Sequence, residues 1–122
     1  MKNITVPEGA LPIGTIVAAK YENCETLYWK FYAITGYTAK RVEIRGIKSK
    51  VTYDDGVDGP HYYDAPKHTQ PIITNGFADV IGAAKKVSYE ITDSGIMRFS
   101  PEPFYRVSGA WSGEPLETYN LH

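Results

Sequence analysis

The sequence predicts a mainly β domain, folded as a small antiparallel barrel or a strongly curved sheet. Short segments alternate apolar and polar residues with a period of two, which is the pattern of half-buried antiparallel strands. Turn-forming residues are frequent, with 11 Gly and 8 Pro, and they separate these segments at short intervals. Tyrosine is the most unusual component, with 10 copies, and aromatic residues favour pleated surfaces. The spacing predicts roughly five to seven strands and one short helical turn.

We expect one domain over residues 1–122, because 122 residues support a real core but not two independent ones. The formal net charge of −1 creates no overall field toward nucleic acid or membrane. The single Cys24 excludes an internal disulfide and fits a reducing compartment. No apolar run is long enough to span a bilayer, and the N-terminus lacks the apolar core of a signal peptide. A cytoplasmic location is therefore expected.

The first quarter of the chain is expected to form an arm, a strand and a loop. Residues 1–12 contain Pro and Gly and are interpreted as an extended arm. Residues 14–21 are rich in β-branched residues and predict the first strand. Residues 22–25 are polar and predict a loop.

The strongest pattern is a predicted hairpin in residues 28–53. The segment 28–34 is rich in aromatic residues. In the segment 40–45, Val42 and Ile44 share one face and charged residues occupy the other. Since a half-buried strand packs its apolar face inward, the charged face is expected to stay in solvent.

Glycines predict a turn and a bend in this hairpin. We expect the turn at residues 35–37 and a bend or bulge at Gly46, after which pairing resumes over residues 47–53. The following residues 54–71 are rich in Asp, Gly, Pro and His and lack periodicity. They predict a long loop, and long loops in compact domains tend to be functional or mobile.

The second half of the chain repeats this logic. Residues 72–82 are weakly apolar and fit either a short strand at 72–73 or more loop. Residues 86–91 alternate cleanly and predict a strand. A turn at 93–95 then leads into a return strand at 96–99.

The end of the chain contains the best helix-start signal. Ser100 fits an N-cap position and Pro101 fits the first helical position. Pro103 and Gly109 restrict this helix to about one or two turns. The last segment, residues 117–119, is expected to close the sheet as an edge strand.

The sequence contains no recognisable catalytic motif. It has no Gly-rich phosphate loop, no Gly-x-Ser-x-Gly elbow and no Cys-x-x-Cys pair. Cys24 lies beside Glu22 and Glu25, whose negative charge makes a thiol a poorer nucleophile. Several carboxylates remain as acid–base candidates, but no local motif pairs them: Glu90, Asp93, Glu102, Glu114 and Glu117. We therefore expect no enzymatic activity, no catalytic residue and no cofactor.

The predicted long loop holds the most metal-like cluster of side chains. Its members are Asp54, Asp55, Asp58, His61, Asp64 and His68. Imidazole and carboxylate groups together suit zinc, manganese or non-haem iron. However, the spacing matches no defined metal site, and a polar turn region explains the same Asp and Gly residues. We therefore expect no metal.

The hairpin at residues 28–53 combines cations with aromatic residues. Its cations are Lys30, Lys40, Arg41, Arg45, Lys48 and Lys50, and its only acid is Glu43. A basic sheet face with exposed aromatic rings is how small barrels bind single-stranded nucleic acid. The alternative is a solvated outer face whose Lys and Arg residues protect an edge strand. The near-zero net charge argues against nucleic acid, which stays the second hypothesis.

A protein partner is the first hypothesis, because Tyr, Trp and Arg are the typical anchors of protein interfaces. The predicted partner-binding residues are Trp29, Tyr32, Tyr37, Lys40, Arg41, Arg45, Lys48, Tyr105, Arg106 and Trp111. The tail offers another candidate patch, formed by Phe104, Tyr105, Arg106, Trp111 and Leu116. A competing interpretation places Phe104 and Trp111 as caps of one barrel end. The sequence is compatible with a monomer or a homodimer.

Short segments of the chain resemble a group of small uncharacterised phage and mobile-element proteins. These segments are Gly-Thr-Ile-Val at 14–17, Tyr-Glu at 21–22, Phe-Tyr-Ala-Ile-Thr-Gly at 31–36, Val-Glu-Ile-Arg at 42–45 and Trp-Ser-Gly-Glu-Pro at 111–115. The Gln-Thr-Asn element of that group is replaced here by Asn-Cys-Glu-Thr. The resemblance implies a viral or integrated element in a bacterial host. Small proteins from such elements often act by binding, including as inhibitors of host defences.

Overall fold

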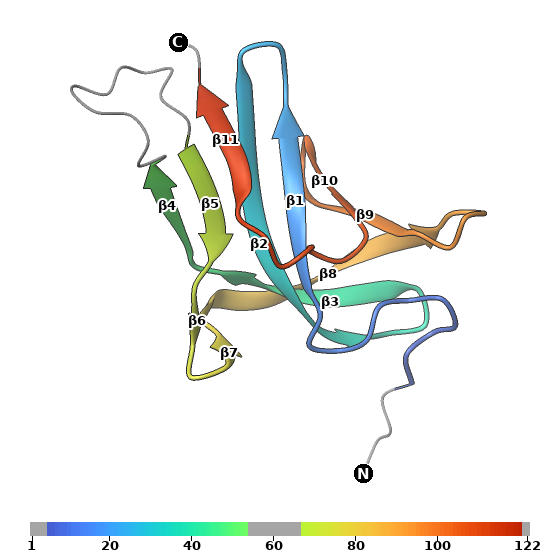
Figure 1. The fold of residues 1–122 in the computed structure, drawn as a ribbon. Helices are drawn as coiled ribbons and strands as arrows, with labels where there is room; N and C mark the ends of the chain where they lie inside the picture. Colours follow the sequence, from blue (N-terminus) through green and yellow to red (C-terminus); the bar gives the residue numbers. More distant parts are fainter. Residues whose placement is uncertain (1–4, 54–66, 121–122) are drawn as a thin grey trace, which may run out of the picture.

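The computed structural model describes residues 5–53 and 67–120, and its centre is a closed six-stranded antiparallel barrel (Figure 1). The barrel strands follow the order β1-β10-β9-β8-β3-β2, and β1 pairs with β2 to close the ring. Their bounds are β1 Ile16–Glu22, β2 Thr26–Tyr37, β3 Arg41–Ile47, β8 Val80–Ile91, β9 Met97–Glu102 and β10 Tyr105–Ser108. The predicted fold class is confirmed.

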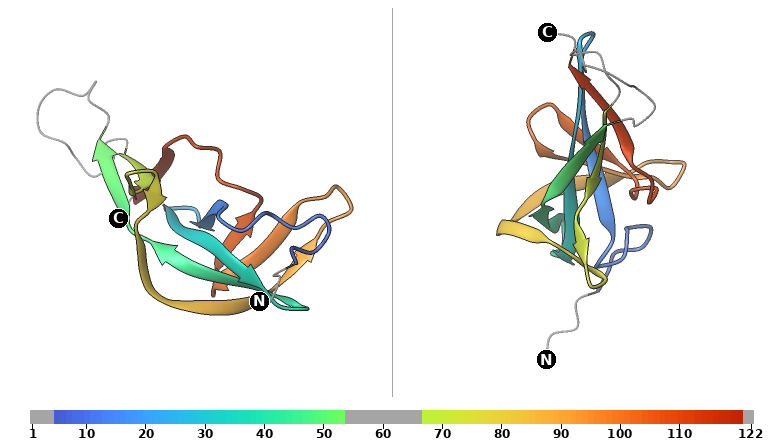
Figure 2. Two further views of the ribbon diagram at one scale, coloured as in Figure 1. Left: turned by 90° about the horizontal axis from the view of Figure 1, so that it is seen from below. Right: turned by 60° about the vertical axis from the view of Figure 1, so that its left-hand side comes forward.

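The remaining strands form an arm beside the barrel. The strand β11 pairs with the first residues of β2 on one side and with β5 on the other, and β4 lies outermost. Figure 2 shows β4 and β5 standing to one side of the barrel. A separate short hairpin consists of β6 and β7. The bounds are β4 Ser49–Tyr53, β5 Lys67–Pro71, β6 Ile73–Thr74, β7 Phe77–Ala78 and β11 Leu116–Asn120.

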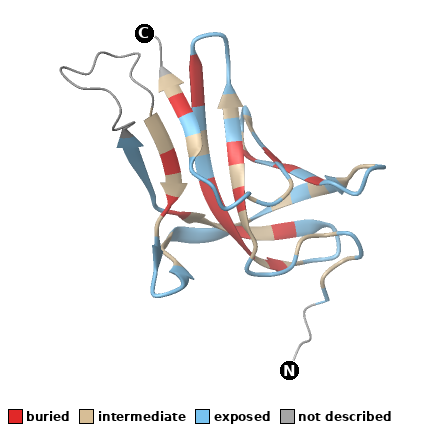
Figure 3. Ribbon diagram, in the orientation of Figure 1, coloured by how far each residue is buried: buried red, intermediate tan, exposed pale blue. Residues whose placement is uncertain are grey.

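The barrel interior is a continuous apolar core, visible as buried positions along β1 and β2 in Figure 3. Val42 and Ile44 are fully buried in it, as their alternation predicts. The other buried members are Val17, Ala19, Tyr32, Ile34, Met97, Phe99 and Val107. Each large apolar side chain buried here contributes about 1.5–3 kcal/mol relative to exposure.

A second apolar cluster lies on the outside of the barrel. Phe31, Ala33 and Ile47 are buried there, with Trp111 and Leu116 packed against them. Since neighbouring residues of a strand point to opposite faces, β2 buries one row inside the barrel and the other row beneath this covering. We name the outside of β2 and β3 formed by Phe31, Ala33 and Ile47 the covered face.

The predicted turn at residues 35–37 is wrong, because β2 continues to Tyr37. The pairing of β2 with β3 shifts register between Ile34 and Gly36, so the glycine lies beside a bulge. The chain turns afterwards, where the Thr38 N–H donates to the Arg41 carbonyl at 2.9 Å. The Arg41 N–H in turn donates to the Thr38 hydroxyl oxygen at 3.2 Å.

The bend predicted at Gly46 is confirmed. The pairing of β3 with β8 shifts register between Ile44 and Gly46. The chain then leaves the barrel at Lys48 and continues as β4 in the arm. Of the predicted long loop, residues 54–66 lie outside the described residues, whereas residues 67–71 form β5 rather than loop.

The segment predicted to start a helix belongs to a strand. Ser100 and Pro101 lie in β9, and Pro101 is buried. The chain instead turns at Phe104, whose φ of 69° is left-handed. Tertiary pairing of β9 with β10 outweighs the local N-cap signal, which is a weak preference. The final strand β11 is also not an edge strand, because β2 and β5 flank it.

The residues before β1 close one end of the barrel. Leu11 packs against the core, and its carbonyl accepts a hydrogen bond from the Tyr37 hydroxyl. Backbone hydrogen bonds join Gly14 N–H to the Ile34 carbonyl at 2.8 Å and Ile34 N–H to the Thr15 carbonyl at 3.0 Å. The N-terminal segment, which the sequence predicts as an extended arm, therefore covers this end of the barrel in its described part. Within the described ranges, no helix of the length and apolarity required to cross a membrane is present.

Candidate binding surface

The other end of the barrel holds a charged network centred on Glu102, at the end of β9. Lys30 Nζ lies 2.6 Å from one carboxylate oxygen of Glu102, and Lys85 Nζ lies 3.9 Å from the other. The Tyr32 hydroxyl, inside the barrel, also donates to this carboxylate. The carboxylate is thus matched by donors from β2 and β8.

This network shifts the pKa values of its members away from neutrality. The hydrogen bond from Lys30 is the main cause that lowers the pKa of Glu102. Burial, followed by the nearby Glu102 charge, raises the pKa of Tyr32. General acid–base catalysis favours groups that titrate near the working pH. The arrangement instead keeps Glu102 ionised and Tyr32 protonated, which suits a fixed polar closure of the barrel end.

Aromatic rings surround this charged end. The Lys30 ammonium lies 4.8 Å from the centre of the Tyr105 ring. The Tyr21 ring lies 5.4 Å from that of Tyr105 and 6.4 Å from that of Tyr28. Cation–π contacts of this kind contribute about 0.5–1 kcal/mol at exposed sites.

Strand alternation produces a cationic row on the outside of β1, β9 and β10. Lys20 pairs in register with Arg106 on β10, and Arg98 lies on the next strand, β9. Lys20 contacts Glu22 at 3.3 Å. Arg98 and Arg106 are exposed, and neither has an ion-pair partner within the described part of the chain. Both guanidinium groups are therefore available to an external anion.

Aromatic side chains border these cations. A surface hollow of about 650 Å³ is lined by Lys20, Arg98, Arg106, Trp29 and Phe104, among others. We name these five residues the cationic face. The Lys20 ammonium lies 5.7 Å from the Trp29 ring centre, and Trp29 Nε1 donates to the Glu117 carbonyl at 2.9 Å. The Trp29 ring is therefore fixed in place at the edge of the hollow.

Phe104 is the most unusual residue of the cationic face. Its side chain is 82% exposed at the tip of the β9–β10 hairpin. Its φ of 69° is uncommon for a bulky residue and costs about 1 kcal/mol or more. A strained backbone that presents an apolar ring to solvent stabilises nothing inside the fold. Such a feature is typical of a contact surface.

The structure brings a few of the predicted partner-binding residues together. Trp29 and Arg106 line the same hollow, and Tyr105 lies at the adjoining charged end. The expectation that Tyr32 and Tyr37 lie on the surface is corrected. Tyr32 is only 4% exposed, and the Tyr37 ring packs on the core at 5.8 Å from the Tyr89 ring. Both rings point inward because β2 alternates around the bulge.

The other predicted residues are dispersed. Lys40 and Arg41 are exposed at the β2–β3 turn, and Lys48 is exposed between β3 and β4. Arg45 donates to the Gly82 carbonyl, with Nη2 at 2.8 Å. Trp111 Nε1 donates to the Glu114 carbonyl at 2.8 Å, and its ring lies 5.8 Å from that of Phe31. The basic residues of the hairpin therefore do not form one patch.

Sequence reasoning missed Lys20 and Arg98, whereas Phe104 was one member of a candidate tail patch. A signal was present for Arg98, because it alternates with Met97 and Phe99, which are buried. For Phe104 the sequence left a contact patch and a barrel cap as alternatives, and a helix was expected at that point of the chain. Its exposure depends on a hairpin turn that only the pairing of β9 with β10 creates.

No metal site is found in the part of the chain that the structure describes. Of the metal candidates, only His68 is described, and it lies in β5. Asp54, Asp55, Asp58, His61 and Asp64 lie outside the described residues. Among the described residues, no group of His, Cys, Asp and Glu gathers as a metal site requires. Cys24 is exposed in the β1–β2 loop.

The fold and this surface define a small β-barrel protein with an aromatic and cationic outer face. No known protein family, curated protein or solved structure matches the chain.

Proposed function

We propose that the chain is a non-catalytic binding protein that docks its cationic face onto a partner protein. The observation that carries this proposal is Phe104, an exposed aromatic ring held on a left-handed backbone beside Arg98 and Arg106. Aromatic and Arg side chains are enriched among the residues that dominate binding energy at interfaces. A nearby hollow gives a partner side chain a place to insert.

The partner segment carries acidic side chains next to an apolar one. Arg98 and Arg106 have no carboxylate partner among the described residues, so a partner carboxylate would complete their interactions. A guanidinium group binds a carboxylate through paired N–H donors, which adds geometric specificity. The apolar side chain would pack against Phe104 and Trp29.

Nucleic acid remains the second hypothesis, with less support. Base stacking needs exposed rings, and Tyr32 and Tyr37 of the basic hairpin pack inside the barrel. The exposed cations of the hairpin are also spread over separate places. Salt dependence separates the hypotheses, because affinity for nucleic acid falls steeply with salt.

The biological setting is also a proposal and rests on the resemblance to phage and mobile-element proteins. In this setting the chain acts in the cytoplasm of a bacterial host. A partner from the host is the first choice, and inhibition of a host defence is one such role. A phage protein is the second.

Affinity capture from a nuclease-treated bacterial lysate tests the docking proposal, with quantitative mass spectrometry as the readout. We expect wild-type protein to capture a partner that Phe104→Ala fails to retain. The matched control is Phe77→Ala, because Phe77 is 77% exposed at the first position of β7, outside the cationic face.

The purified partner then gives the affinity. We expect Phe104→Ala to weaken binding roughly 30-fold, as residues that dominate an interface do, and Phe77→Ala to change it little. An equal loss of affinity in both variants would indicate non-specific binding by exposed aromatic rings, which would contradict the proposal. Wild-type affinity in Phe104→Ala would contradict the proposal. A partner that wild-type protein captures from untreated lysate but not from nuclease-treated lysate would favour nucleic acid.

A further inference from the structure

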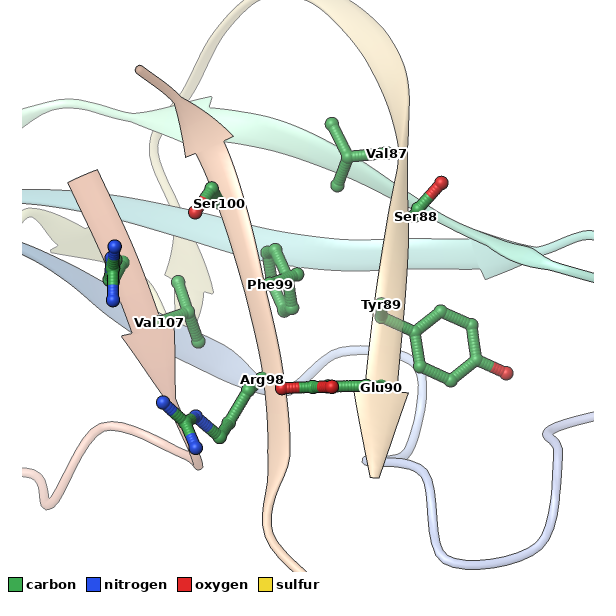
Figure 4. A pocket seen from close by; sticks show the side chains of 9 residues that line it. Val87, Ser88, Tyr89, Glu90, Arg98, Phe99, Ser100 and Val107 are labelled. Carbon is green, nitrogen blue, oxygen red and sulfur yellow. The ribbon is translucent and has the colours of Figure 1, made fainter. Parts of the chain in front are cut away.

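A second hollow, of about 570 Å³, opens in the barrel wall between β8 and β9 (Figure 4). The strands pair at Ile91 with Met97, at Glu90 with Arg98 and at Tyr89 with Phe99. Among the described residues no further pairing joins them, and β8 continues against β3 while β9 continues against β10. The strands therefore diverge and leave a slot.

The slot has an apolar floor and polar walls. Val87, Phe99 and Val107 line it and also pack in the barrel core. The hydroxyl-bearing Ser88 on β8 and Ser100 on β9 line it from either side. Figure 4 shows Val87 projecting from β8 toward β9, with Phe99 between the strands and Ser100 on β9, whereas the Ser88 hydroxyl points away from the opening.

The slot is short. It begins where the Tyr89–Phe99 pairing ends, and Lys85 reaches Glu102 at 3.9 Å at the far side. From Phe99 to Glu102 a strand advances only about 10 Å, at roughly 3.4 Å per residue. Typical strands are about 5–6 residues long, so the slot is too short for an added strand. Its volume of about 570 Å³ suits a small molecule.

The rim of the slot is positively charged. Arg98 and Arg106 line it, and neither has an ion-pair partner among the described residues. Glu90, the cross-strand neighbour of Arg98, is the acid on the rim. The guanidinium groups outnumber this carboxylate, so an anionic group is favoured at the rim, where paired N–H donors suit a carboxylate or phosphate.

We propose that this slot binds a small organic anion, with its charged group held by Arg98 and Arg106 and a slender apolar body on Val87, Phe99 and Val107. This inference stands without the docking function, although both use Arg98 and Arg106. A ligand in the slot and an acidic partner on the cationic face would therefore compete.

Titration of ¹⁵N-labelled protein with octanoate, followed by NMR, tests the proposal. We expect saturable shifts at the backbone amides of Val87, Ser88, Phe99 and Ser100. Acetate lacks the apolar body and octylamine carries the opposite charge, so each should bind at least about 10-fold more weakly. Octyl phosphate distinguishes a preference for phosphate from one for carboxylate. Absence of shifts with both anions, or equal shifts with octylamine, would overturn the proposal.

Variants separate the slot from the docking face. We expect Ser100→Phe to block octanoate, because Ser100 lines the slot and is exposed, so a larger ring there occupies the slot without displacing a core residue. We expect Arg106→Gln to weaken octanoate about 10-fold. Lys20→Gln is its matched control, because Lys20 pairs in register with Arg106 but does not line the slot.

Phe104→Ala should leave octanoate binding unchanged, so failure of the docking proposal and failure of the slot proposal are distinguishable. Each variant is checked by its unchanged amide shifts away from the slot. Undiminished binding of octanoate by Ser100→Phe, in a folded variant, would overturn the assignment of the slot.

Discussion

The covered face and the cationic face are outer sides of the same barrel, but the first is buried and the second is exposed to solvent. On the covered face, Phe31 and Ile47 point away from the barrel interior and are buried by the arm and by Trp111. On the cationic face, Arg98 and Arg106 point outward and remain in solvent. The chain therefore covers its apolar outer surface with its own residues, and it leaves its charged and aromatic outer surface exposed to solvent.

Trp29 lies between these faces and shows how the difference arises. It packs against the covered cluster, and its Nε1 is fixed by the Glu117 carbonyl. It also lines the hollow of the cationic face. Packing on the covered face thus holds the Trp29 ring in position for the cationic face. The covered face is expected to contribute to stability, and the cationic face to binding.

The largest expected effect is on the covered face. Replacing Phe31 by Ala removes a buried ring and should lower the free energy of unfolding by about 3–5 kcal/mol. Arg98→Ala, on the cationic face, should change it by no more than about 0.5 kcal/mol. Urea denaturation measures both. Similar losses in the two variants would remove the distinction between the faces.

Glu102→Gln is expected to have the next largest effect, because it weakens the charged barrel end. At pH 7 it should cost about 1 kcal/mol, because solvent screens a pair whose two side chains are 47% and 33% exposed. The pKa of Glu102 is lowered in the fold, so its contribution is present above the unfolded pKa and is lost as pH falls through the folded pKa.

Urea unfolding at pH 7 and at a series of decreasing acidic pH values therefore checks the sign of this effect. The difference between wild type and Glu102→Gln should shrink as the pH falls through the lowered pKa of Glu102, where the wild-type carboxyl group takes up its proton. A difference that stays constant over this range would show that the charge of Glu102 does not stabilise the barrel end.

Tyr37→Phe tests the opposite end of the barrel. The variant loses the hydrogen bond to the Leu11 carbonyl and should cost about 1 kcal/mol at neutral pH. Burial raises the pKa of Tyr37 from 10.0 to about 12. Its contribution is therefore complete below pH 10 and is lost as pH rises toward 12. Thermal unfolding between pH 9 and pH 12 should show the difference between variant and wild type narrowing; a widening difference would contradict this assignment.

Much of the barrel could be predicted because alternation is a local property. Val42 and Ile44 alternate with charged residues, and both are buried as expected. The bend at Gly46 was also predicted, because a lone glycine in a strand pattern marks a bulge or bend. The same logic places Arg98 outside the barrel, between Met97 and Phe99.

The remaining features depend on contacts between distant parts of the chain. Tyr32 looked like a surface ring because the sequence does not show that β2 is buried on both sides, once by the barrel and once by the arm. Ser100 and Pro101 carry a local helix signal, and the pairing of β9 with β10 overrides it. For Phe104 the sequence left a contact patch and a barrel cap as alternatives, and this pairing places the residue at a hairpin tip.

Removing the side chain of Phe104, the residue most important for the proposed function, is expected to cost no stability. Phe104→Gly relieves a left-handed backbone that glycine adopts without steric cost. The free energy of unfolding should therefore stay unchanged or rise by up to about 1 kcal/mol. Chemical denaturation measures this change, and a large loss of stability would show that Phe104 supports the fold instead.

Partner affinity of Phe104→Gly, measured beside Phe77→Gly, tests the central claim most directly. If the cationic face is the docking surface, Phe104→Gly should bind the captured partner roughly 30-fold more weakly while Phe77→Gly binds about as well as wild type. Wild-type affinity in Phe104→Gly, together with intact folding, would contradict the claim that this face binds the partner.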